Sequence, residues 1–375
     1  MDLRKATPSL WLALGEAQSK CEHIAGVPLR PATAHELHQL YLAKGIQATT
    51  AIEGNTLSED EVRNRIEGRL ELPPSKEYQG REVDNILEAS NSILEEIARG
   101  QTRDLTPERV KEFNRMVLKD LDVPDHATPG EITKKQVGVG TVYKGAPVED
   151  CEYLLEKLCA WLASDEFKPP DSQRIVYGLV KAIIAHVYLV WIHPFGDGNG
   201  RTARLMEVKI LLEAGVPSSA AHLLSNYYNQ TRMEYYRQLD RASKSGGDLL
   251  PFIKYAIDGF LDQVREQIQR IRYEQWDVAW RNYVHERFRD RKSRADGRRR
   301  RLALAISAAG EVVAVSELRR LDPRVAEDYA NKTNKTVTRD LNVLRKLGLI
   351  ERAEGGIRAK KEGILAFLPV SRFDP

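Results

Sequence analysis

The chain has 375 residues, of which 42% are hydrophobic and 30% are charged, and its formal net charge is +3. This length exceeds what one hydrophobic core usually organises, so we expect more than one domain. The small net charge excludes a protein that binds its partners simply as a polycation, and the hydrophobic content suffices for ordinary globular cores.

Cysteine usage and the N-terminus indicate the cellular setting. The three cysteines show no metal-ligand spacing, which favours a reducing compartment. Residues 1–18 contain no basic region followed by a sustained apolar stretch, so no secretory signal is visible. The apolar run Ile175–Ile192 contains Lys181 and His186, and we interpret it as a buried core helix rather than a membrane span. The sequence therefore predicts a cytoplasmic protein without a membrane partner.

Residues 1–105 are predicted to form an N-terminal helical region. A helical pattern covers residues 31–50, and Gly54 and Asn55 after it are residue types that end helices. Ser58 and Glu61 fit a capping box that opens another helix. Further helices are predicted over residues 81–99 and 106–121, the second of which begins with a Thr cap followed by Pro.

A glycine-rich stretch follows at Pro129. Glycines at 130, 138, 140 and 145 surround Val137, Val139 and Val142, and this short alternation predicts a small β-hairpin. Helical patterns then resume over residues 148–163, 172–192, 202–214, 230–243 and 248–271.

The C-terminal part has a different organisation. Residues 265–301 are strongly basic and compatible with helix. Helices are then predicted over residues 302–308, 315–321 and 334–347, and a hairpin turns at Glu354-Gly355-Gly356. Three helices followed by a hairpin outline a winged helix. We therefore predict a mainly α protein with a small hairpin, a basic helical connector over residues 263–297 and a winged-helix-like domain over residues 298–375.

The chemistry is concentrated in the twelve-residue segment His193–Arg204, which has the sequence His-Pro-Phe-Gly-Asp-Gly-Asn-Gly-Arg-Thr-Ala-Arg. Its glycines allow positive φ and a close approach of the backbone to a ligand. The amides that begin the next helix are unpaired and carry the positive end of the helix dipole, so this is an anion site.

Side chains of the same segment complete a phosphate site. Arg201 and Arg204 share one face of the first helical turn, so both guanidinium groups can reach one polyphosphate. Asp197 is an oxygen ligand suited to Mg²⁺, and His193 can take a proton near neutral pH. A calcium loop is excluded because no later acidic ligands follow at the required spacing, and a P-loop because Gly-Lys-Ser/Thr is missing.

The segment resembles the signature of the Fic family, His-Pro-Phe-x-Asp/Glu-Gly-Asn-Gly-Arg-x-x-Arg, and every fixed position is present. The resemblance implies a Fic-type helical bundle over residues 106–262. It also implies a protein adenylyltransferase, which moves AMP from ATP to a Ser, Thr or Tyr hydroxyl of a target protein or of itself.

The resemblance further implies a role for each residue of the signature. His193 is the general base, and Asp197 holds Mg²⁺. Gly198, Asn199, Gly200 and Arg201 bind the α- and β-phosphates, and Arg204 binds the γ-phosphate. Within the same fold the reaction stays open, because phosphate transfer, transfer of another nucleotide or removal of AMP would use a similar site.

Residues 49–55 (Thr-Thr-Ala-Ile-Glu-Gly-Asn) resemble the inhibitory motif of these enzymes, and we call them the inhibitory segment; the helix that carries them is expected over about residues 40–55. Its Glu53 is expected to pair with Arg204 and so to occupy the cation that the γ-phosphate needs. The alternative is an ordinary surface glutamate at a helix end.

The C-terminal helix over residues 334–347 surrounds an apolar stripe with basic and polar residues, interrupted by Asp340. This pattern is compatible with a DNA recognition helix, so a nucleotide-responsive DNA-binding regulator is a further alternative. A winged helix used for protein contact or for homodimer packing remains the competing interpretation.

Overall fold

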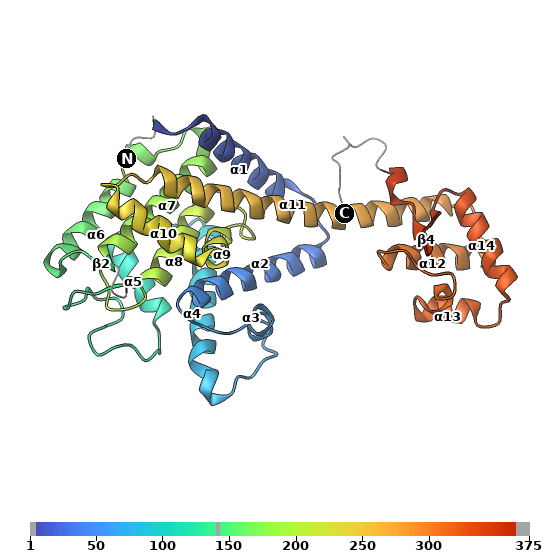
Figure 1. Cartoon of the computed structure of the whole chain (residues 1–375), viewed down its shortest axis with the longest axis horizontal. Helices are drawn as coiled ribbons and strands as arrows, with labels where there is room; N and C mark the ends of the chain where they lie inside the picture. The colour runs from blue at the N-terminus through green and yellow to red at the C-terminus, as the bar shows by residue number, and fades with distance from the viewer. Residues whose placement is uncertain (1–4, 140–142, 365–375) are drawn as a thin grey trace. The chain divides into compact units, whose positions relative to one another are not determined.

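The computed structural model describes residues 5–139 and 143–364 (Figure 1). The described residues are mainly α-helical and contain two small antiparallel sheets of two strands each, as predicted. The chain divides into two compact units, which we call the N-terminal unit (residues 1–269) and the C-terminal unit (residues 270–375).

The N-terminal unit begins with four helices: α1 Pro8–Gly26, α2 Pro31–Ile52, α3 Glu59–Ile66 and α4 Glu77–Ala98. Helix α2 contains the predicted helix and most of the inhibitory segment. The capping box of α3 is present, with the Ser58 hydroxyl accepting from the Glu61 amide and the Glu61 carboxylate accepting from the Ser58 amide. Short 3₁₀ turns also occur along the chain: η2 Pro74–Lys76, η3 Asp165–Phe167, η4 Asp171–Gln173, η5 Leu318–Arg320 and η6 Lys361–Ile364.

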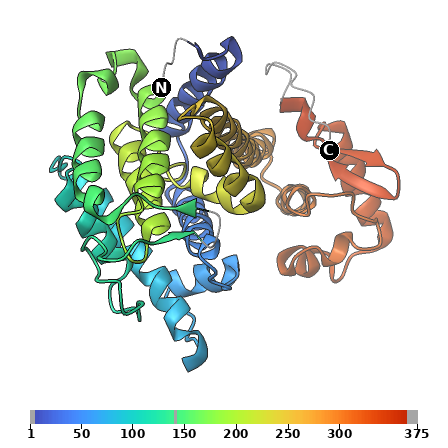
Figure 2. The same cartoon turned by 60° about the vertical axis from the view of Figure 1, so that its left-hand side comes forward.

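The centre of the unit is built from α5 Pro107–Val117, α6 Val148–Leu162, α7 Arg174–Ile192 and α8 Asn199–Glu213. Helices α7 and α8 lie side by side (Figures 1 and 2). Residues 171–192 are long and apolar enough to cross a membrane, but 72% of the most apolar window is buried inside the structure. Helix α7 is therefore placed as the core helix of this unit.

Three helices end the unit: α9 Leu223–Gln230, α10 Arg232–Lys244 and α11 Leu250–Arg287, whose residues from 270 onward belong to the C-terminal unit. Helix α9 was not predicted from the sequence. The end of α11 was predicted sixteen residues too early, because the apolar positions Trp280 and Val284 near its end are buried in the C-terminal unit instead.

The predicted hairpin is present as β1 Gly138–Val139 and β2 Tyr143–Lys144, with Gly138 opposite Lys144. Gly140 and Val142, which belong to the same prediction, lie outside the described residues.

The C-terminal unit contains α12 Arg294–Ala308, α13 Pro323–Tyr329, α14 Asn334–Lys346, and the antiparallel strands β3 Ile350–Ala353 and β4 Gly356–Ala359. The order of three helices and a hairpin agrees with the prediction. The helix predicted over residues 315–321 is wrong: only a 3₁₀ turn forms there, and α13 begins at Pro323. Asp322 causes this later start because its carboxylate accepts the amides of Arg324 and Val325.

The structure divides the chain into two units, whereas the sequence predicted four segments with boundaries after residues 105, 262 and 297. The N-terminal helices α2 and α4 pack against α8, so residues 1–105 share one compact unit with the central helices. Residues 263–297, expected as a connector, include Trp280, Val284 and Phe288, which are buried in the core of the C-terminal unit.

Asp340 is the polar centre of the C-terminal unit. It is fully buried and accepts hydrogen bonds from Arg298, Arg299 and the hydroxyl of Tyr329, at 2.7 to 2.9 Å. This placement corrects the expectation that Asp340 interrupts a basic surface, because its charge lies inside the unit.

We predict that Asp340→Ala lowers the free energy of unfolding of the C-terminal unit by about 3 kcal/mol, because two arginines lose a buried partner. Glu351→Ala, which removes an exposed ion pair with Arg358, should change it by less than about 0.5 kcal/mol. Urea unfolding followed by tryptophan fluorescence measures both. Equal effects of the two substitutions would contradict the role of Asp340.

Candidate active site

The loop that joins α7 to α8 has an unusual backbone. His193 ends α7 with φ +52°, and Gly198 precedes α8 with φ +75°. A left-handed conformation is costly for a residue with a side chain, so the surrounding structure must hold His193 there. Its amide donates to the Leu189 carbonyl at 2.9 Å, which ties it to the last turn of α7.

Phe195 and Asn199 fix this loop from within. The Phe195 side chain is fully buried, and its backbone exchanges two hydrogen bonds with the Asn199 side chain, at 2.7 and 3.0 Å. The side-chain amide of Asn199 therefore holds the loop through both its oxygen and its nitrogen.

Asn114 of α5 is a loop contact that the sequence analysis missed. Its side chain donates to the Asp197 carbonyl and to the Thr202 hydroxyl, and accepts from the Gly130 amide. The available signal was a fully buried polar residue on the apolar face of α5 beside Phe113.

His193 is held in a form suited to accept a proton. Its Nδ1 lies 3.2 Å from the Val190 carbonyl oxygen, and if Nδ1 carries the proton, the lone pair of the neutral ring is on Nε2. Burial lowers the pKa of His193, while the Val190 hydrogen bond and the charges of Glu53 and Asp197 oppose this shift.

Arg201 lies between two carboxylates. One guanidinium nitrogen lies 2.5 Å from Glu82 of α4, and another donates to both oxygens of Asp197 at 3.2 Å. Glu82 also accepts from the Asn55 side chain at 2.9 Å. Glu82 was missed because it comes from a distant helix, although an acidic residue next to the buried Val83 was a signal.

Arg204 contacts the inhibitory segment directly, as predicted. The Arg204 side chain is 1% exposed and lies 2.5 Å from the Glu53 carboxylate, and it also donates to the Thr49 carbonyl. Burial opposes ionisation of Glu53, but the charge and hydrogen bond of Arg204 outweigh it and lower the pKa of Glu53.

The Glu53 carboxylate also lies over the first turn of α8. A methyl group on Gly200 would come within 2.3 Å of its Oε1, so only glycine permits this approach. The carboxylate is therefore placed where the dipole of α8 favours negative charge.

The site contains hydrogen-bond donors that have no acceptor within the protein. Among the described residues, the buried Nε atoms of Arg201 and Arg204 have no hydrogen-bond partner. These donors and the amides that begin α8 fit phosphate oxygens. No group of three metal-ligating side chains occurs in the described part of the chain. Asp197 alone fits Mg²⁺, which commonly takes one carboxylate together with substrate phosphates.

The hairpin is anchored beside His193. The Ala146 amide donates to the Ile192 carbonyl, and the Thr133 amide donates to the Pro194 carbonyl. A methyl group on Gly145 would lie 2.7 Å from the His193 Cβ, so the hairpin closely borders the proposed base.

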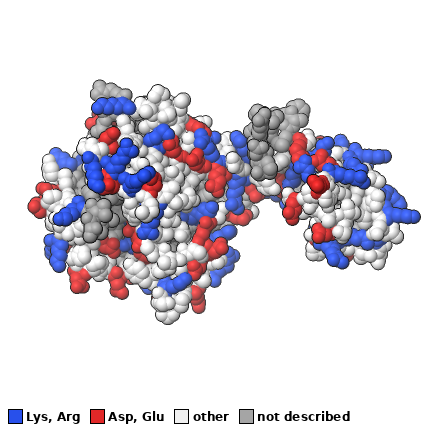
Figure 3. All heavy atoms as spheres, viewed as in Figure 1, with Lys and Arg blue, Asp and Glu red and all other residues white. Residues whose placement is uncertain are grey.

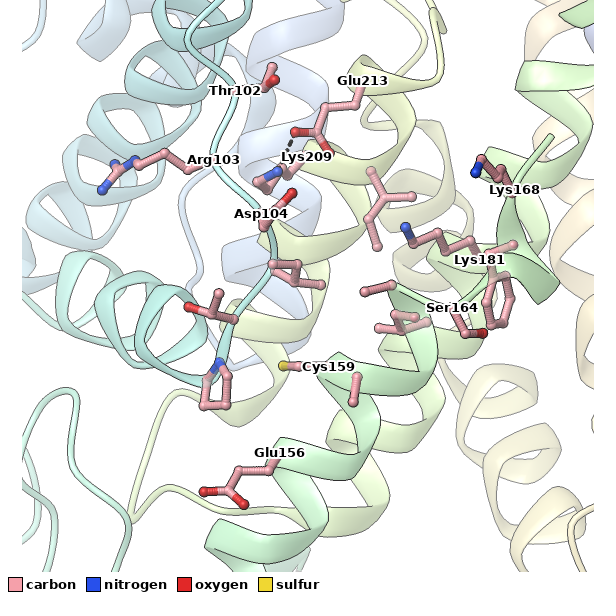
Figure 4. Close-up of a pocket in the computed structure, with 18 of the residues that line it drawn as sticks. Thr102, Arg103, Asp104, Glu156, Cys159, Ser164, Lys168, Lys181, Lys209 and Glu213 are labelled. Carbon is pink, nitrogen blue, oxygen red and sulfur yellow. Dashed lines mark hydrogen bonds and ion pairs between the residues drawn. The ribbon is translucent and has the colours of Figure 1, made fainter.

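A separate cavity of about 650 Å³ lies toward the other ends of α7 and α8 (Figure 4). Lys181 and Lys209 line it from these two helices, and Lys209 pairs with Glu213. No residue of His193–Arg204 lines this cavity, and Lys181 lies about 18 Å along α7 from His193. It is therefore not the predicted phosphate site.

The fold and the loop define a helical domain in which a histidine, a carboxylate, two arginines and a helix N-terminus converge. The model of the Fic/DOC family matches residues 104–211, which include α5 to α7, the whole loop and most of α8. Residues 104–211 are therefore a Fic/DOC domain.

Curated relatives agree with this assignment. A protein adenylyltransferase of Caenorhabditis briggsae is 32% identical over 261 residues, covering 68% of this chain and 47% of the relative. Another, from Nematostella vectensis, is 34% identical over 216 residues, covering 56% of this chain and 45% of the relative. The chain thus spans about half the length of these relatives.

Solved structures share the fold. A Fic family protein from Desulfovibrio desulfuricans has a TM-score of 0.58 at 21% identity, covering 97% of this chain and 94% of the other. A Fic-1 fragment from Caenorhabditis elegans has a TM-score of 0.57 at 26% identity, covering 70% of this chain and 73% of the other.

We predict that the His193 imidazole titrates below pH 6.5, its ordinary value, because burial disfavours the charged ring. Glu53→Gln should lower the midpoint further, because the Glu53 charge favours the imidazolium. NMR titration of labelled histidines, with His193→Asn to assign the signal, measures both. A midpoint at or above 6.5, or an upward shift in Glu53→Gln, would contradict this account.

Proposed function

We propose that the protein is an autoinhibited protein adenylyltransferase, which transfers AMP from ATP to a hydroxyl group of a protein. The observation that carries the proposal is the convergence of His193, Asp197, Arg201 and Arg204 at the N-terminus of α8. The names of the relatives support AMP as the transferred group.

In this proposal, His193 accepts the proton of the target hydroxyl at Nε2. The hydroxyl oxygen attacks the α-phosphorus of ATP, and the bond to the β-phosphate oxygen breaks, so that pyrophosphate leaves. The backbone of residues 198–200 and the guanidinium of Arg201 bind the phosphates, and Arg204 orients the leaving group.

Asp197 is the residue that would hold Mg²⁺, which when bound supplies positive charge beside the leaving phosphates. Asp197 would then exchange its contact with Arg201 for the ion. Glu82 remains paired with Arg201 and keeps that guanidinium in place.

The inhibitory segment controls access to the same cations. Because the Glu53 carboxylate occupies both the Arg204 guanidinium and the space over Gly200, the terminal phosphate of ATP has to displace it. Intact protein is therefore expected to bind ATP weakly or in a pose in which the α-phosphorus is misplaced.

We predict that Glu53→Gly increases self-labelling or target labelling by between about 5- and 150-fold, the usual range for coupling between two sites. His193→Ala in the same background should abolish it. Mass spectrometry after incubation with Mg²⁺-ATP identifies the added group. An added phosphate in place of AMP would favour a phosphotransferase with the same fold.

Glu36→Gly is the matched control, because Glu36 is an exposed residue of α2 and the substitution weakens the helix without touching Arg204. Labelling should stay at the level of the unmodified protein. If Glu53→Gly behaved like Glu36→Gly, the inhibitory role of Glu53 would be wrong.

A second candidate function is contact with duplex DNA through α14 of the C-terminal unit, which we propose to be a winged helix. Every exposed position of α14 is basic or uncharged, because its one acidic residue, Asp340, is buried. Lys335, Arg339, Arg345 and Lys346 form no ion pair with another described residue.

The charge of the two units supports this candidate. Lys and Arg outnumber Asp and Glu in residues 270–375, whereas the reverse holds in residues 1–269. Figure 3 shows Lys and Arg side chains gathered over the C-terminal unit. A cationic helix with a neighbouring hairpin fits the phosphates that flank a DNA groove.

We predict that the protein binds a 20-base-pair duplex and that affinity falls steeply with salt. Replacing Lys335 and Arg339 by Ala should weaken binding and reduce the salt slope by about 2, because two phosphate contacts are lost. Arg281→Ala, which removes a cation paired with Asp277, is the control. Salt-independent binding, or none by fluorescence anisotropy, would instead assign α14 to protein contact.

Two further expectations from the sequence, self-association of the protein and its cytoplasmic location, stay predictions.

A further inference from the structure

The last turn of α2 presents Glu53 to Arg204, and its backbone carbonyls need partners. The Thr50 carbonyl accepts from the amides of Glu53 and Asn55, and the Ala51 carbonyl accepts from the amide of Gly54. The Ile52 carbonyl, which immediately precedes Glu53, accepts from the guanidinium of Arg232 at 2.6 Å. No other described residue donates to it.

Arg232 is the first residue of α10. Its second nitrogen lies 3.3 Å from the Ala51 carbonyl, so one side chain spans the two carbonyls at the end of α2. A cation at a helix C-terminus also interacts favourably with the helix dipole. The Arg232 guanidinium lies 6.0 Å from the ring of Tyr236, one turn further along α10.

The helix that carries Arg232 is rigidly attached to the core. Tyr235, three residues after Arg232, is buried and lies 2.9 Å from the imidazole of the fully buried His186 of α7. Arg232 thus connects the end of α2, through α10, to the core helix that ends at His193. Among the described residues, no other cationic side chain donates to the carbonyls of residues 51 and 52.

We propose that Arg232 is a positioning residue of the inhibitory segment: it fastens the last turn of α2 so that the Glu53 carboxylate stays over Gly200 and against Arg204. The inference rests on the proposed inhibition by Glu53. Arg232 itself forms no described contact with Arg204 or with any other residue of His193–Arg204.

The direction of the effect separates this role from a merely structural one. Loss of an ordinary structural contact lowers activity, whereas loss of Arg232 should raise it, because the last turn of α2 frays and Glu53 leaves Arg204 more often. Apparent KM for ATP should fall together with this rise, since the carboxylate and the terminal phosphate compete for one guanidinium.

The test compares Arg232→Met, which keeps the apolar stem and removes the donors, with Arg237→Met in the full-length protein. Arg237 lies on the same helix, is exposed and pairs with Glu234, so it is a matched control. We expect about a tenfold rise in self-labelling with ATP for Arg232→Met, equivalent to about 1.4 kcal/mol, and no change for Arg237→Met. Arg232→Lys, which retains the charge but not the two-nitrogen fork, should lie between them.

The combination with Glu53→Gly decides whether the effect acts through Glu53. Arg232→Met should add nothing to the labelling of Glu53→Gly, because the carboxylate that it positions is already gone. A further rise in the double variant, or unchanged or lower labelling in Arg232→Met alone, would overturn the proposal for Arg232 and leave the role of Glu53 intact. No rise in Glu53→Gly itself would overturn both.

Hydrogen exchange supplies a readout that does not depend on activity. The amides of residues 49–55 should exchange faster in Arg232→Met than in the unmodified protein or in Arg237→Met. Unchanged exchange there would also overturn the proposal.

Discussion

The site depends on one constraint, the pair of hydrogen bonds between the Asn199 side chain and the Phe195 backbone. The phenyl ring of Phe195 is fully buried. Phe195 anchors the loop in the core, and Asn199 sets where α8 begins. His193 therefore leaves α7 in a left-handed conformation and the amides of α8 face the same space. The His193 imidazole and the first amides of α8 are thus brought together by two neighbouring helix ends.

Two carboxylates from outside the loop control its two arginines, and they differ in kind. Glu82 is almost completely buried with Arg201, so its ion pair is part of the core. The Glu53 side chain is one-third exposed and lies at the end of a helix, where fewer contacts hold it. Breaking the Glu82–Arg201 pair would leave both charges buried, whereas the Glu53 carboxylate can return to water and leave only the buried Arg204 guanidinium, which a ligand anion can then neutralise. Under the proposed function, this difference suits Arg201 to permanent positioning and Arg204 to competition between protein and ligand.

The inhibitory segment is also connected to the rest of the site. Asn55 donates to Glu82, which holds Arg201, while Arg232 holds the carbonyls just before Glu53. A movement of residues 51–55 therefore changes hydrogen bonds to α4 and α10 as well as the contact with Arg204.

The sequence by itself determined several features that depend on neighbouring residues: the mainly helical fold, the twelve-residue loop, its family, the capping box at Ser58 and the small hairpin. The pairing of Glu53 with Arg204 was also predictable, but only because a second local motif resembles that of the family. The partners of Glu82, Asn114 and Arg232 were not predictable, because each partner comes from a distant part of the chain, although Glu82 and Asn114 lie beside the apolar stripes of their helices. The late end of α11 and the burial of Asp340 were missed for the same reason. Local spacing determines which groups share a loop or a helix face, whereas packing between helices decides which charges meet and are withdrawn from water.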